Sequence, residues 1–183
     1  MEGINIMEPM FRDLKANEID CRVSQINEKG LTLLLYKDAR VDMDILDETV
    51  GAKNWQRRHI RDNANCIIEI WDENKNQWIC KEDTGKESSS EAEKGLASDS
   101  FKRAGFNWGI GRELYTAPFI YIPLEDKNRD YNFDLTERNG KKSTYTKFIV
   151  EKIQITNKEI TALAIKNNKG KRVFVYQKQV NNG

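Results

Sequence analysis

The sequence predicts an α+β fold: an antiparallel sheet packed against a long helix, with a C-terminal β meander. Short runs rich in Val, Ile, Leu and aromatic residues, separated by turn-forming residues, predict the strands. Apolar residues that recur at three- and four-residue spacing in two other segments predict the helices. A chain of 183 residues suits one domain with a small appendage. We expect a core domain over residues 1–124, a polar linker over 125–144 and the meander within 145–183.

The first elements follow from local patterns. Residues 8–17 favour a short amphipathic helix through Met10, Phe11 and Leu14. Strands are expected at 21–27 and 31–37, joined as a hairpin because Gly30 can take a positive φ. Residues 39–50 are expected to be helical.

Three apolar residues, Met43, Leu46 and Val50, form the predicted stripe of that helix, and Gly51 supplies its stop. The runs 65–72 and 77–83, separated by ENKN, predict a second hairpin. Residues 117–124 are apolar and are expected to close the core. The meander should place three strands within 145–177, with turns at NK and NNKG.

A second helix is expected before that apolar segment. Ser90 and Glu93 form a capping-box pattern that opens it, and two glycines at 109 and 111 end it. Lys102 and Arg103 are expected on its exposed side. The apolar stripe that should face the core consists of Ala97, Phe101, Ala104 and Trp108.

From the composition we expect a soluble, cytoplasmic protein that does not associate with a membrane. The chain is 38% hydrophobic and 32% charged, and it has no apolar run near the roughly eighteen residues of a membrane span. The first residues lack the basic and apolar regions of a secretory signal. Cys21, Cys66 and Cys80 are far apart and odd in number, which favours reduced, buried thiols over disulfides or a zinc site. The single histidine, His59, excludes a histidine-based metal cluster, and its arginine neighbours disfavour a further positive charge on it.

Two segments raise enzymatic interpretations. Gly105, Gly109 and Gly111 have the spacing G-x-x-x-G-x-G after a helix, which is not the pattern of a nucleotide-binding loop, so no nucleotide cofactor is expected. The segment Glu125–Lys127 contains an E-x-K pattern. With Asp99 or Asp83 it could hold Mg²⁺ in a nuclease or related DNA-processing enzyme, and this alternative stays open.

Basic and aromatic residues suggest a groove for single-stranded nucleic acid instead. Net charge is only +1, but local cations are sufficient to contact phosphates. A scaffold without nucleic acid is the remaining alternative. The candidate DNA-binding residues are Arg40, Lys53, Trp55, Arg57, Arg58, Lys102 and Arg103.

Four features in order resemble the Rad-fifty-two type of single-strand annealing protein, above all the phage Sak-like recombinases. These features are R-V-x-x-x-(I/L)-L at 40–46, G-x-x-x-W at 51–55, a β-hairpin with an aromatic second strand, and D-x-x-K-R-A at 99–104 before a glycine turn. The resemblance covers about residues 30–123. The 145–177 meander has no counterpart in it.

The resemblance implies a β-β-β-α core and an oligomeric ring that anneals single strands without ATP, catalysis or cofactor. It implies DNA contacts by Lys102, Arg103 and Arg40, and a phage-encoded role in homologous recombination or double-strand break repair in the cytoplasm of the bacterial host. The implied partners are single-stranded DNA, with double-stranded DNA as a further candidate, other copies of the chain, and a phage exonuclease or the host single-strand-binding protein.

Overall fold

The computed structural model describes residues 11–86 and 92–179, and these residues form the mixed α+β fold with antiparallel sheets that the sequence predicts. The chain divides into two compact units. Unit 1 comprises residues 1–13 and 38–112, and unit 2 comprises residues 14–37 and 113–183. Unit 1 is therefore inserted into the chain of unit 2.

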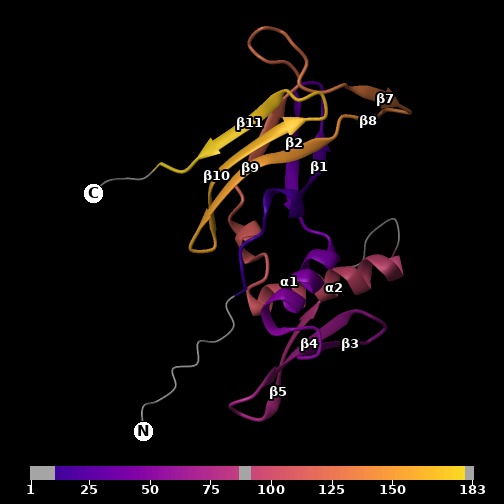
Figure 1. The fold of residues 1–183 in the computed structure, drawn as a ribbon. Helices are drawn as coiled ribbons and strands as arrows, with labels where there is room; N and C mark the ends of the chain where they lie inside the picture. Colours follow the sequence, from indigo (N-terminus) through magenta and orange to yellow (C-terminus); the bar gives the residue numbers. More distant parts are fainter. Residues whose placement is uncertain (1–10, 87–91, 180–183) are drawn as a thin grey trace. The chain divides into compact units, whose positions relative to one another are not determined.

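Unit 1 consists of two helices and a three-stranded antiparallel sheet. Strand β4 lies between β3 and β5, and both helices lie on one side of the sheet (Figure 1). The strand β3 was not expected from its polar sequence. The elements are α1 (Ala39–Val50), β3 (Trp55–Ile60), β4 (Asn65–Asp72), β5 (Gln77–Thr84) and α2 (Ala92–Trp108).

The ends of α1 confirm the expected helix over 39–50. The Asp38 carboxylate accepts a hydrogen bond from the Arg40 backbone N–H at 2.8 Å, which caps the first turn. Gly51 ends the helix with a φ of 83°, a conformation that glycine adopts without strain. The buried residues Ile45 and Leu46 face the core, whereas the expected stripe members Met43 and Val50 are half-buried.

Helix α2 packs on β4 and β5, and its core contacts centre on two expected residues, Phe101 and Ala104, which are fully buried. The other two members of the predicted stripe, Ala97 and Trp108, are half-buried. Positive φ values at Gly109 and Gly111 follow the helix, as its predicted end requires. The capping box of Ser90 and Glu93 lies outside the described residues and side chains.

Unit 2 contains a six-stranded antiparallel sheet. Its strand order is β11-β10-β9-β1-β2-β6, and the two edge strands β6 and β11 contact each other, so the sheet is strongly curled. A separate hairpin of β7 (Thr136–Arg138) and β8 (Lys141–Ser143) follows β6 in the chain. The six strands are β1 (Asp20–Ile26), β2 (Gly30–Tyr36), β6 (Ile120–Pro123), β9 (Phe148–Thr156), β10 (Glu159–Asn167) and β11 (Arg172–Gln177).

This sheet groups the chain differently from the expected segments 1–124, 125–144 and 145–183. The three predicted meander strands are present, but they join β1, β2 and β6 in one sheet (Figure 1). Their apolar face contributes Val150, Leu163 and Ile165 to the buried core. The segment 125–144 is more than a polar linker, because it includes β7, β8 and the buried residue Phe133.

The expected helix over 8–17 is wrong for its described part. Residues 11–15 are not helical, and only Ala16–Glu18 form a short 3-10 turn. Phe11 and Leu14 are buried without helical structure. The Leu14 N–H donates to the Glu113 Oε1 at 2.7 Å rather than to a helical carbonyl.

The hairpin of β1 and β2 is confirmed, but the expected reason for Gly30 is wrong. Gly30 does not have a positive φ; it is the first residue of β2. A Cβ at this position would lie 2.5 Å from the Ile122 carbonyl oxygen and 2.5 Å from the Tyr121 hydroxyl. Close approach of β6 therefore requires the glycine.

We expect Gly30→Ala to lower the free energy of unfolding by about 1–3 kcal/mol, because the added methyl group has no space beside the β6 backbone. Chemical denaturation followed by far-ultraviolet circular dichroism measures this. An alanine substitution at an exposed position of the same hairpin, Ser24→Ala on β1, should change the free energy of unfolding by less than about 0.5 kcal/mol. Equal stabilities of the two variants would contradict the close-approach explanation.

None of the described helices is long and apolar enough to cross a membrane.

Candidate nucleic-acid interface

Strand β3 presents alternate side chains to the two faces of the unit 1 sheet. Trp55 and Arg57 lie on the face that α2 covers, since both contact Phe101 of that helix. His59 lies on the same face, with its Nδ1 3.4 Å from the Ser100 hydroxyl. Arg58 lies on the opposite face, because successive strand residues alternate. The predicted basic run is therefore divided between two surfaces.

Phe101 holds the first two of these side chains in place. Its ring lies 6.3 Å from the Trp55 ring in a stacked arrangement. The Arg57 guanidinium carbon lies 4.6 Å from the same ring centroid, within the range of a cation–π interaction. The Trp55 Nε1–H donates to Asp47 of α1 at 2.6 Å, so this indole is anchored on both sides. These contacts make Trp55 a support for the surface rather than a mobile stacking platform.

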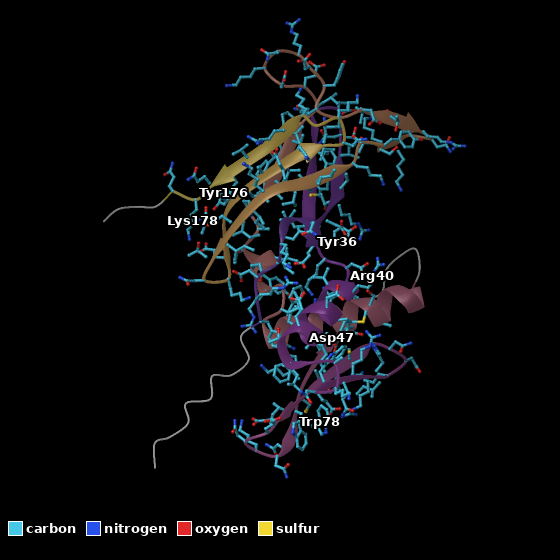
Figure 2. The ribbon with its side chains drawn as sticks, viewed as in Figure 1. Tyr36, Arg40, Asp47, Trp78, Tyr176 and Lys178 are labelled. Carbon is cyan, nitrogen blue, oxygen red and sulfur yellow. The ribbon has the colours of Figure 1, made fainter. Side chains whose placement is uncertain are left out.

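The charges of Arg40 and Lys102 both act on Asp38. The Arg40 side chain is 81% exposed and its Nε lies 2.9 Å from the Asp38 carboxylate (Figure 2). Hydrogen bonds from Arg40 lower the pKa of Asp38, and the charge of Lys102 contributes to the same shift. Helix α2 thus brings Lys102 near the start of α1. We call Arg40, Arg57 and Lys102 the unit 1 cation set.

The other predicted residues are placed differently. Arg103 was expected on the exposed side of α2, but it is half-buried, and its Nε lies 3.5 Å from the Asp83 carboxylate. Arg58 pairs with Glu69 at 3.7 Å on the opposite face of the sheet. Lys53 is exposed in the turn after α1. Lys102 is itself half-buried, so only part of its side chain reaches the surface.

One cation at this face was not expected from the sequence. The Lys81 ammonium of β5 lies 4.4 Å from the Trp108 ring centroid and donates to the Asn107 carbonyl at 2.9 Å. Asn107 in turn donates to the Glu82 carbonyl oxygen at 2.9 Å. These contacts fasten the end of α2 to β5. The sequence did contain a signal for the placement of Lys81: it lies two residues after the apolar Ile79 in β5, so the two side chains share one face of the sheet.

The surroundings of His59 disfavour its protonation, as the arginines beside it in the sequence suggest. Burial lowers the pKa of His59, and the nearby Arg57 charge lowers it further. The neutral ring is therefore favoured in the folded protein. Because the pKa of His59 is lower in the folded than in the unfolded state, the unfolded protein binds this proton more readily. His59 therefore lowers the free energy of unfolding as pH falls below the ordinary histidine pKa near 6.5.

The carboxylates of the nuclease alternative have structural partners. Asp126 lies 2.9 Å from the Lys171 ammonium and accepts the backbone N–H of Asn128 at 2.8 Å. The hydrogen bond from Lys171 lowers the pKa of Asp126. Asp99 accepts the Lys86 backbone N–H at 2.8 Å. Across residues 11–86 and 92–179, no group of three or more His, Cys, Asp or Glu side chains is arranged to hold a metal ion.

The three thiols differ in environment. Burial raises the pKa of Cys21 to about 12, with a contribution from the Asp20 charge, and burial raises the pKa of Cys66 to about 11. Cys80 is exposed, contrary to the expectation that all three are buried. Because the thiolate is the reactive form, exposure and thiolate content should decide the order of modification.

We expect iodoacetamide at neutral pH to modify Cys80 well before Cys21 and Cys66. Mass spectrometry of peptides at successive times measures the order. Denatured protein serves as the reference, since all three thiols should then react at similar rates. Modification of Cys66 in step with Cys80 under native conditions would contradict the buried environment of Cys66.

Comparison of the chain with models of protein families, with curated proteins and with solved structures gives no match.

Proposed function

We propose that the protein binds single-stranded DNA and anneals complementary strands during homologous recombination or double-strand break repair. The observation that carries this proposal is the unit 1 cation set. Its members come from α1, β3 and α2, which are far apart in sequence. Arg40 and Lys102 act on Asp38, and Arg57 lies over the Phe101 ring of α2. A surface of this kind can neutralise phosphates without reading base sequence.

The order of elements in unit 1 supports the same proposal. Three antiparallel strands, β3, β4 and β5, are followed directly by α2. This succession agrees with the β-β-β-α core expected from the resemblance to the Rad-fifty-two type of annealing protein. Lys102 and Arg103 lie on the helix of that core, where the resemblance expects DNA contacts.

Annealing needs cations that hold the phosphates while the base edges stay open to a second strand. It needs no catalytic acid, base, metal or nucleotide. In this proposal the protein is a phage-encoded, non-catalytic ring of identical subunits that works in the cytoplasm of the bacterial host. Sedimentation velocity with and without DNA tests the oligomer.

Annealing of two complementary labelled oligonucleotides, without ATP and with or without Mg²⁺, tests the activity. Acceleration that is independent of Mg²⁺ is the expected result. Failure to accelerate annealing would overturn the proposal. Shortening of the strands when Mg²⁺ is added would favour the nuclease, and absence of DNA binding at physiological salt would favour a scaffold.

A further inference from the structure

A groove of about 570 Å³ opens in unit 2 where β1 and β9 separate. The two strands pair through one residue pair, Asp20 and Ile149. The antiparallel ladder would continue from residues 21–23 to residues 146–148, but these two segments instead form opposite walls of the groove. The volume falls within the range of roughly 300–1,000 Å³ that ligand sites occupy.

Asp134 holds one wall of this groove in place. Its carboxylate accepts the Tyr145 N–H at 3.0 Å and the Thr144 hydroxyl at 3.2 Å, and the Thr146 hydroxyl also donates to it. Burial opposes ionisation of Asp134, but these hydrogen bonds outweigh burial and lower its pKa. The ionised side chain thereby fixes residues 144–146 away from β1.

The side chains on the open side of the groove combine aromatic rings and positive charge. Tyr145 is 79% exposed, and Tyr36 lies 42% exposed at the end of β2 (Figure 2). Arg22 and Lys147 are exposed and make no ion pair with any described residue. Asp20 is the one carboxylate of the lining, so the cations are in excess.

We propose that this groove binds a segment of single-stranded nucleic acid, with Tyr36 and Tyr145 stacking on bases and Arg22 and Lys147 contacting phosphates. Rings and cations side by side are the arrangement that binds single strands without sequence preference. A peptide added to the open edge of β1 would use the backbone and leave these four side chains without a role. The groove lies wholly within unit 2, so the proposal does not depend on the unit 1 cation set.

Photocrosslinking locates the contact directly. The full-length chain is irradiated with an oligothymidine in which one base is 5-iodouracil, and the crosslinked peptides are identified by mass spectrometry. Crosslinks at Tyr36 or Tyr145 are the expected result. Crosslinks confined to unit 1 would overturn the proposal that the groove binds nucleic acid and would leave the proposed annealing function intact.

A pair of matched variants measures the contribution of the groove. Tyr145→Ala with Lys147→Gln should weaken oligothymidine binding on the order of tenfold, as loss of one stacked base and one phosphate contact requires. Tyr131→Ala with Lys169→Gln removes the same residue types at exposed positions of unit 2 outside the groove and should leave affinity unchanged. Equal affinities of the two variants would overturn the proposal. Binding of a peptide, rather than of the oligothymidine, in the groove would also overturn it. Annealing that fails while groove crosslinks persist would overturn only the proposed function.

Discussion

Replacing Arg40, Arg57 and Lys102 together by glutamine is expected to weaken single-stranded DNA binding by roughly a hundredfold at about 0.1 M salt. Each phosphate contact on a single strand contributes about 0.7 to the slope of log affinity against log salt concentration. Loss of three contacts should therefore reduce the slope by about 2. Fluorescence anisotropy of a labelled oligothymidine over a range of salt concentrations measures both quantities.

A second triple variant with the same change in net charge provides the control. Glutamine at Lys127, Arg129 and Lys169 removes three exposed cations of unit 2 that lie outside both proposed surfaces. Its binding should stay close to that of the wild type, because net charge alone does not create a contact. If both triple variants lose the same affinity, binding depends on overall charge and the cation set has no special role. Circular dichroism confirms that both variants fold.

Phe101→Ala is expected to lower the free energy of unfolding by about 3–5 kcal/mol, the usual cost of truncating a buried phenylalanine. Phe101 is fully buried and contacts both the Trp55 ring and the Arg57 guanidinium. Its loss removes packing under α2 and also releases two side chains at the candidate interface. Urea denaturation followed by far-ultraviolet circular dichroism measures the stability.

Phe119→Ala removes the same side chain from a position that is 80% exposed. It should change the free energy of unfolding by less than about 0.5 kcal/mol. The fluorescence of the tryptophans adds a second readout, since Trp55, Trp71, Trp78 and Trp108 all belong to unit 1. A Phe101→Ala protein as stable as the Phe119→Ala protein would contradict the central place of Phe101 in the unit 1 core.

Local patterns in the sequence predicted most elements of the fold. The helix at 39–50, both hairpins and the three meander strands follow from turn residues and apolar spacing, although Gly30 is required by the close approach of β6 rather than by a positive φ. Strand β3 did not, because Gln56, Arg57 and Arg58 interrupt its apolar pattern, and the strand is stabilised by pairing with the buried β4. The joining of the meander to β1 depends on contacts between residues far apart in sequence, which a local pattern does not encode.

The candidate site was predicted in part for the same reason. Residue types identified Arg40, Arg57 and Lys102, but alternation along β3 separates Arg58 from Arg57. The partner of Arg103 is Asp83 on β5, twenty positions away, and no spacing rule indicates that ion pair. The unit 2 groove depends on the point where β1 and β9 stop pairing, which only three-dimensional structure specifies.

The insertion of unit 1 between β2 and β6 sets an order of events during protein synthesis. Hairpin β1–β2 leaves the ribosome early, but the strands that complete its sheet are β6 and β9–β11, the last of which ends at Gln177. Unit 1 is encoded almost entirely by the continuous stretch 38–112, so all its strands and helices emerge before those partners do. Domains fold as units during synthesis, with N-terminal ones first. We therefore expect unit 1 to fold on the nascent chain while the apolar face of β2 is still exposed to solvent. A ribosome that stalls before β9 is made would leave that face exposed and prone to aggregation.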